Sequence, residues 1–201
     1  MRSRKIFSKA TVIGNGESRL PIDIDNISAT KIGCNAIIRH HFVDVCVCVD
    51  KKMLRECIQY QVNCDTIYTR KEYTVIDSKF VRALPSLFYH GQQRSDNTQH
   101  WGSGPYALLL AAGLYNRIQI IGFDLYSSTA YVNNCYKGSE NYNMPTKRAV
   151  DPRYWIYQTA KVIEHFSDTE FEIYQTDDWT QPESWKLPNV SVDTISNFQY
   201  T

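Results

Sequence analysis

The chain has 201 residues and a formal net charge of +1, with 43% hydrophobic and 21% charged residues. This composition suits one soluble domain with a sizeable core. The near-neutral charge gives no reason to expect a nucleic-acid partner. No segment approaches the ~20 apolar residues that a membrane-spanning helix needs, so we expect no membrane span.

The six cysteines, at positions 34, 46, 48, 57, 64 and 135, form no Cys-x-x-Cys pair and no metal-ligand spacing with the histidines. They are typical of reduced structural thiols, so we expect a cytoplasmic protein without a metal site. Cys46 and Cys48 alternate within a strand pattern, which predicts that both side chains lie on the same face.

A short apolar run at about residues 9–13 leads into Gly14-Asn15-Gly16 and then into a polar helix start. Two glycines at such a turn let the backbone approach a phosphate or a nucleobase closely, and free N–H groups at a helix start favour an anion. Because position 19 is Arg, the stretch is not Gly-x-Gly-x-x-Gly. The local pattern therefore leaves a structural turn and a ligand loop both open.

The first half of the chain alternates apolar runs with helical spacing. We expect a turn or short helix after Pro21, and the run at 44–50 is the clearest strand because its apolar residues are continuous. The predicted elements here are strands at 9–13, 29–34, 44–49 and 66–69 and a helix at 51–60.

The second half begins with a candidate strand at 87–89. Ser103 then opens a buried helix over 106–115, with Gly104 as its cap and Pro105 in its first position. The other predicted elements are strands at 117–121 and 171–174, a helix at 151–166 and a long polar loop at 127–150. We divide the chain into an α/β domain, 1–176, and a tail, 177–201, that packs on the domain.

Strands that alternate with helices predict a three-layer, Rossmann-like α/β domain with a mainly parallel sheet. A parallel sheet places the carboxyl ends of its strands along one edge. We therefore expect the polar clusters that follow these strands to converge with the start of the buried helix. These clusters are Gly14–Ser18, Cys34-Asn35, Asp50, Ser103-Gly104 and Gly122–Tyr126.

The ordered motifs Ile-Gly-Asn-Gly-x-Ser, Cys-Asn, Ser-Gly and Gly-x-Asp-x-Tyr lie within residues 10–131. Together they resemble bacterial sialyltransferases that use a CMP-sugar donor. They also resemble related proteins that include a hydroxymethylpterin pyrophosphokinase. The resemblance implies a nucleotide site that includes Gly14, Asn15, Gly16, Asn35, Asp50, Ser103 and Gly104.

In that family two tyrosines bind the donor phosphate, and the matching positions are Tyr126 and Tyr131. Neutral tyrosine donors would replace a metal ion, so we expect no cofactor. Asp50 stands where the sialyltransferases have asparagine, and a carboxylate there would repel a phosphate unless it faces ribose hydroxyls.

The family's catalytic histidine has no match, because no histidine lies between Tyr131 and Asp151. The nearest acid–base candidates are Glu140 and Tyr142. We expect Glu140, or else Asp124, to act as the general base, with the carboxyl pKa raised by partial burial.

The resemblance implies a metal-independent glycosyltransferase that takes a nucleotide-activated sugar, CMP-linked, and a hydroxyl-bearing acceptor. A catalytically silent nucleotide-binding or assembly module is the alternative. A third hypothesis, pyrophosphate transfer to a pterin, would need Asp50 and Asp124 to bind Mg²⁺. The sugar, the acceptor and a homo-oligomeric state stay open.

Overall fold

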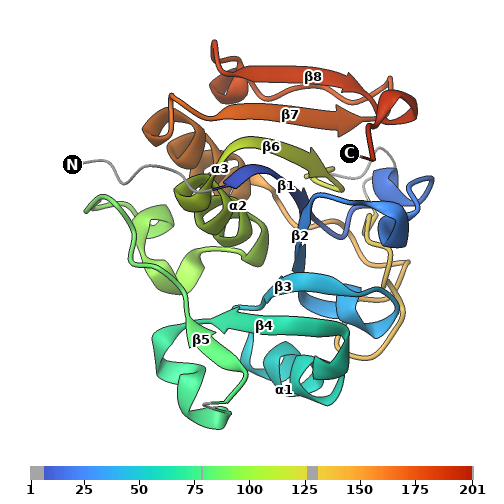
Figure 1. The fold of residues 1–201 in the computed structure, drawn as a ribbon, viewed down its shortest axis with the longest axis vertical. Helices are drawn as coiled ribbons and strands as arrows, with labels where there is room; N and C mark the ends of the chain where they lie inside the picture. The colour runs from blue at the N-terminus through green and yellow to red at the C-terminus, as the bar shows by residue number, and fades with distance from the viewer. Residues whose placement is uncertain (1–6, 78, 126–130, 201) are drawn as a thin grey trace.

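The computed structural model describes residues 7–77, 79–125 and 131–200. Within them a single sheet has the strand order β5-β4-β3-β2-β1-β6-β7-β8, and neighbouring strands pair in parallel. Figure 1 shows this sheet from β8 at the top to β5 at the bottom. The strands are β1 (Phe7–Ile13), β2 (Thr30–Cys34), β3 (Val43–Val47), β4 (Cys64–Thr69), β5 (Val81–Ala83), β6 (Tyr115–Ile121), β7 (Glu170–Gln175) and β8 (Val190–Thr194).

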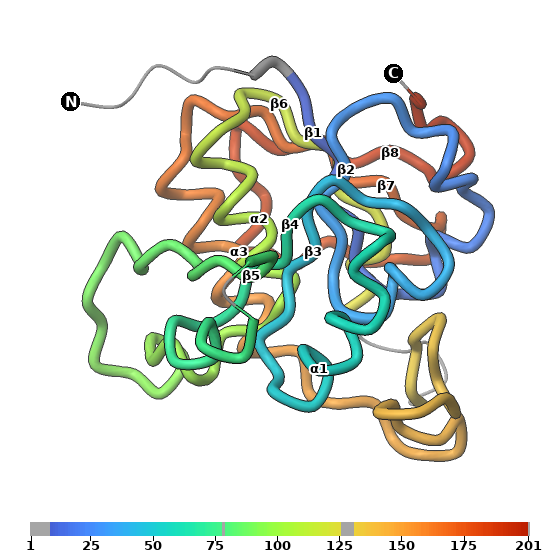
Figure 2. Tube along the Cα trace, turned by 60° about the horizontal axis from the view of Figure 1, so that its bottom comes forward, coloured from blue at the N-terminus to red at the C-terminus, as the bar shows by residue number. Residues whose placement is uncertain are grey.

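Helices cover both faces of the sheet, so the predicted three-layer α/β fold is confirmed. One core lies between the sheet and the helices α2 (Ser103–Leu114) and α3 (Arg153–His165). A second core lies between the opposite face and α1 (Lys51–Gln59). Figure 2 shows α2 and α3 together, away from α1.

The sheet register explains why the central strands read as continuous apolar runs. Val12 of β1 lies beside Ile32 of β2 and Ile120 of β6, all buried against α2 and α3. The next residue, Ile13, is buried in the other core. Alternate side chains therefore enter opposite cores, and both need to be apolar.

The order of the strands reverses next to β1. The chain runs outward from β1 to β5 and then returns to form β6 on the other side of β1. Loops that leave β1 and β6 in opposite directions create a crevice at the carboxyl edge of the sheet, where ligands bind in open α/β folds.

The expected strand at 87–89 is absent, which corrects that prediction. The sheet edge is formed instead by β5, and Phe88 stacks on His165 with ring centroids 3.9 Å apart. The aromatic character of this segment therefore serves packing against the end of α3, while Pro85 cannot supply the N–H that a ladder needs.

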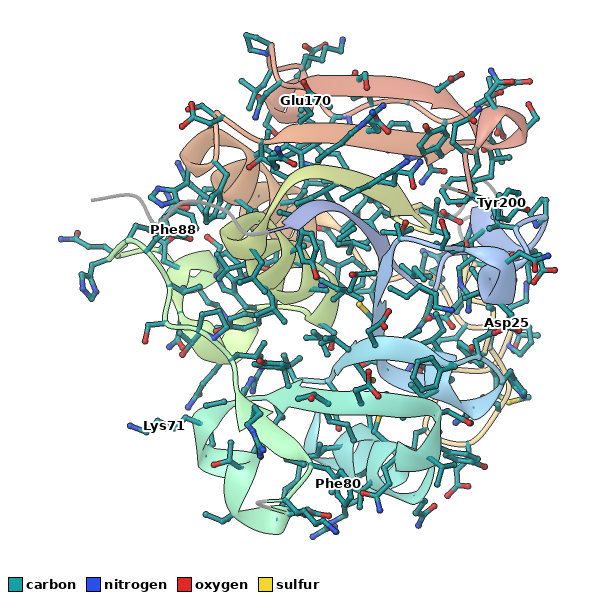
Figure 3. The ribbon with its side chains drawn as sticks, in the orientation of Figure 1. Asp25, Lys71, Phe80, Phe88, Glu170 and Tyr200 are labelled. Carbon is teal, nitrogen blue, oxygen red and sulfur yellow. The ribbon has the colours of Figure 1, made fainter. Side chains whose placement is uncertain are left out.

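The segment 177–201 contributes a strand that its sequence pattern does not predict. β8 pairs with β7 along its whole length. Trp185 is fully buried, and its Nε1 donates to the Ile156 carbonyl at 2.9 Å. Near the end of the chain the Tyr200 carbonyl accepts hydrogen bonds from Ser28, and Figure 3 places Tyr200 on the side of the molecule that carries Asp25.

The cysteines of the described residues are free thiols. Cys46 and Cys48 are both buried in the core beside α1, so their predicted common face is confirmed. None of the helices in the described ranges is long and apolar enough to cross a bilayer.

Candidate functional site: a cleft at the carboxyl edge of the sheet

A cleft of about 770 Å³ lies over the carboxyl ends of β1, β2, β3 and β6. The start of α2 forms one wall, and residues from the segment 132–150 form the opposite wall. The predicted nucleotide-site residues that line it are Gly14, Asn15, Gly16, Asn35, Asp50, Ser103 and Gly104. The structure thus brings together side chains that are up to 90 positions apart in the sequence.

Asn35 and Ser103 are joined directly. Ser103 Oγ donates to Asn35 Oδ1 at 2.9 Å and accepts from the Val49 N–H at 3.2 Å. Asn35 has a φ of 53°, a left-handed conformation that asparagine tolerates better than most residues. The loop after β2 is therefore tied to the start of α2 across the cleft.

Asn15 and Tyr142 form a second polar pair in the cleft wall. Asn15 Nδ2 donates to the Cys34 carbonyl at 3.0 Å and to Tyr142 Oη at 3.3 Å, and the Ala36 N–H reaches Tyr142 Oη at 3.4 Å. Asn15 Oδ1 is buried without a partner among the described residues. Burial raises the pKa of Tyr142, so the phenol stays protonated and can act as a donor.

The two glycines after β1 are required by the protein's own packing, in addition to their place in the cleft lining. A Cβ at Gly14 would lie 2.3 Å from the Gly122 carbonyl oxygen. A Cβ at Gly16 would lie 2.3 Å from the Asp124 carboxyl carbon. Any side chain here would collide with the loop after β6, whether or not a ligand is present.

Asp124 holds the loop after β1 in place. Its carboxylate accepts hydrogen bonds from the Ser18 N–H at 2.9 Å, from Ser18 Oγ and from Gln175 Nε2 at 3.3 Å. The residue is 6% exposed. Since both carboxylate oxygens already have donors, the structure favours a capping role for Asp124 over the general base that we expected.

The two helix starts at the cleft differ in their capping. Asp50 caps α1, since its Oδ1 accepts from the N–H groups of Lys52 and Met53 at 2.8 and 3.4 Å. The α2 start has Gly102 as its N-cap and no side-chain cap. Ser103 is the first helical residue and Pro105 the third, two positions later than predicted. The start of α2 is thus open to an anion, with the exposed Lys52 among the cleft residues.

Glu140 and Tyr131 lie outside the set of residues that line the cleft. Glu140 is exposed, so the predicted partial burial of this side chain is wrong. Tyr131 is 52% exposed and forms an isolated bridge with Arg148. Tyr126, the other predicted phosphate ligand, lies outside the described residues.

A buried ion pair fixes the segment that carries Tyr142. Arg39 pairs with Glu56 and donates to Ser139 Oγ at 2.6 Å and to the Glu140 carbonyl at 2.7 Å. Glu56 also accepts from Asn141 Nδ2 at 2.7 Å. The contacts that Arg39 and Glu56 make with residues 139–141 join positions 85 to 101 residues apart in the sequence. No local pattern could therefore have revealed them.

Residues 7–77, 79–125 and 131–200 contain no group of three or more His, Cys, Asp or Glu side chains placed to hold a metal ion. Asp50 and Asp124, the pair that a pterin pyrophosphokinase would use for Mg²⁺, are each engaged in capping a neighbouring segment.

Neither a protein-family model nor a curated protein matches the sequence. Solved structures of the sialyltransferase CstII from Campylobacter jejuni do share its fold. The complex with the substrate analogue CMP-3FNeuAc has a TM-score of 0.52 and 16% identity, covering 83% of this chain and 81% of that chain. The complex with cytidine-5'-monophosphate has a TM-score of 0.52 and 14% identity, covering 83% and 79%. The fold is therefore sialyltransferase-like. These matches do not extend to the pterin kinase.

Proposed function

We propose that the protein binds a nucleotide-activated sugar, CMP-linked, in the cleft and transfers the sugar to a hydroxyl-bearing acceptor without a metal ion. One observation carries the proposal: Asn15, Asn35 and Ser103, which the resemblance assigns to the nucleotide, meet in one cleft at the β1/β6 edge. The sialyltransferase-like fold supports it, because CstII was solved with a CMP-sugar analogue.

Within this proposal the start of α2 and Lys52 attract the phosphate. The Tyr142 hydroxyl donates a hydrogen bond to the ligand, since its oxygen already accepts from Asn15 and Ala36. A neutral phenol and free backbone N–H groups can stabilise a departing phosphate without a metal ion.

Asp50 replaces Glu140 as our choice of general base. The carboxylates among the described cleft residues are Asp50 and Asp124. Asp50 is exposed, and only its Oδ1 takes part in capping α1. The acceptor hydroxyl would attack the anomeric carbon while the carbon–oxygen bond to the phosphate breaks, and Asp50 would take the proton. Asp50→Asn should then lower turnover about 10²–10⁴-fold while CMP still binds. A loss of CMP affinity instead would assign Asp50 to the ribose.

The first test is a thermal-shift and calorimetry panel of CMP, UDP, GDP and ATP, each with and without Mg²⁺. A ligand at 100 times its dissociation constant stabilises the protein by about 2.7 kcal/mol. We expect CMP to bind without Mg²⁺, and CMP-sialic acid to be consumed when an acceptor is present. Preference for a purine nucleotide that depends on Mg²⁺ would contradict the proposal.

A catalytically silent nucleotide-binding module is the second candidate. It is favoured by the engagement of Asp124 with Ser18 and by the position of Glu140 outside the cleft lining. CMP binding without any consumption of CMP-sugars would support it.

A further inference from the structure

Arg19 is a buried cation without an acidic partner among residues 7–77, 79–125 and 131–200. It belongs to the short helix η1 (Glu17–Arg19) and is 4% exposed. Its Nη2 donates to Tyr136 Oη at 3.2 Å, while its Nε is buried with no hydrogen bond. The guanidinium also lies 5.7 Å from the centre of the Tyr136 ring. No carboxylate of the described residues lies within ion-pair distance of it.

Buried guanidinium groups are normally paired, because an uncompensated charge in a low-dielectric interior is costly. Arg19 has only a neutral phenol and the face of its ring for compensation. The nearby Asp124 carboxylate is occupied by Ser18 and Gln175. The described part of the chain therefore supplies no negative charge that would balance Arg19.

The Arg19 side chain packs against the backbone that lines the cleft. A Cβ at Gly122, which lines the cleft, would lie 3.1 Å from Arg19 Cδ. Cys34 also lines the cleft: burial raises the pKa of its thiol to about 12, and the Arg19 charge is the main influence that opposes this rise. The positive field of Arg19 thus reaches the cleft floor between β1, β2 and β6.

We propose that Arg19 is the fixed positive charge that the cleft holds for the phosphate of its ligand, and that the ligand's anion supplies the missing counter-charge. This inference rests on the proposed function, in which the sugar donor carries a phosphate, and it adds the group that balances the charge of that phosphate. Arginine suits this role because it stays protonated at any working pH. Its charge acts through protein rather than through water, so it is weakly screened. Direct contact with the ligand is left to the cleft-lining groups.

The experiment compares CMP with cytidine, which lacks the phosphate, by calorimetry on three proteins. Wild type should bind CMP more tightly than cytidine. Arg19→Met should lose CMP affinity by about tenfold or more and leave cytidine unchanged. Arg117→Met is the matched control. It removes one positive charge from β6 at a residue that pairs with Glu172 away from the cleft lining, and it should bind both ligands like wild type. Equal CMP affinity in Arg19→Met and wild type would overturn the inference.

Inorganic phosphate separates this inference from the proposed function. If wild type binds no nucleotide but is stabilised thermally by phosphate, and Arg19→Met is not, Arg19 has the proposed role and the nucleotide proposal fails. If CMP binds and phosphate stabilises wild type and Arg19→Met equally, the nucleotide proposal stands and the role proposed for Arg19 fails.

The thermal stability of the protein without ligand tests the premise that the charge of Arg19 is uncompensated. Because the charge of Arg19 in the wild type is uncompensated, the Arg19→Met variant should melt at the wild-type temperature or above it in a buffer free of multivalent anions. Arg19→Gln keeps a donor for Tyr136 and is the second neutral variant. Failure of both neutral variants to fold would show that Arg19 is structural and would overturn the inference.

Discussion

Gly16 has no room for a side chain, because the Asp124 carboxylate occupies the space in which a Cβ would lie. Asp124 in turn fixes Ser18, and so this contact sets the shape of the loop after β1. The glycines of this loop are therefore needed for the close contact between the ends of β1 and β6, and any effect on a ligand is indirect.

We expect Gly16→Ala to destabilise the fold by about 1–3 kcal/mol, because Asp124 must leave Ser18 or the loop must shift. Urea denaturation measures the change. Gly113→Ala is the matched control: no atom lies within 4 Å of a Cβ at this position in α2, so we expect stabilisation by up to about 1 kcal/mol. Equal effects of the two substitutions would contradict the packing argument.

The hydroxyl group of Tyr142 makes the contacts of this residue with the cleft wall. Tyr142→Phe removes the acceptor for Asn15 and Ala36 and the donor that we assign to the ligand. We expect CMP affinity to fall about tenfold, in line with the loss of one hydrogen bond. Glu140→Gln, which alters an exposed side chain in the same segment, should leave the affinity unchanged. A larger effect of Glu140→Gln would restore Glu140 to the site.

At the scale of elements, the wall that carries Tyr142 has little regular structure and depends on side-chain contacts. In the described part of this segment, 131–150, Arg39 and Glu56 join it to the layer that contains α1. Figure 2 shows the segment in gold at the edge of the molecule beside α1. The free energy of local unfolding should therefore be lower for this wall than for the sheet.

The Arg39–Glu56 pair should make this wall sensitive to acid. Burial alone would raise the pKa of Glu56, but hydrogen bonds from Arg39 and Asn141 outweigh it and lower the pKa below 4.5. A carboxyl group whose pKa is lowered by folding stabilises the protein above its unfolded pKa, and that stability is lost as the pH falls through the folded value. We expect amide exchange in 136–142 to accelerate as the pH falls below the usual range for a glutamate carboxyl group, after correction for intrinsic rates.

Glu56→Gln is the variant that checks this explanation. It should be less stable than wild type by about 1–3 kcal/mol near neutral pH, with the difference shrinking as the pH drops. A difference that stays constant over the acid range would rule out titration of Glu56 as the cause.

For the whole molecule, the C-terminal residues complete the sheet. β8 lies at the edge beside β7, and Trp185, between the two strands in sequence, is fully buried against α3. A division after residue 176 therefore cuts through one sheet and one core.

We expect truncation after residue 176 to abolish cooperative unfolding, since it exposes β7 and the core beneath Trp185. Trp185→Ala should cost about 3–5 kcal/mol. Trp155→Ala, at a side chain that is 36% exposed, is the control and should cost much less. Thermal unfolding followed by circular dichroism separates these outcomes. A cooperative transition in the truncated chain would show that residues 1–176 fold independently.

The sequence alone determined the parallel three-layer fold, because buried parallel strands require continuous apolar runs and these runs stand out, as at 44–50. It also predicted which segments meet, since the carboxyl ends of parallel strands share an edge. Asn15, Asn35, Asp50 and Ser103 were grouped on that basis and do line one cleft.

Only the tertiary structure decided which side chains of the long polar segment reach the cleft. Its position is set by contacts of Arg39 and Glu56 with residues about 85 to 101 positions away, which leave no periodic signal in the sequence. The same holds for Arg19, since its lack of a counter-charge depends on every group that folds around it. Local patterns encode which faces of strands and helices are buried. The pairing of charges across the fold depends on how distant segments are brought together.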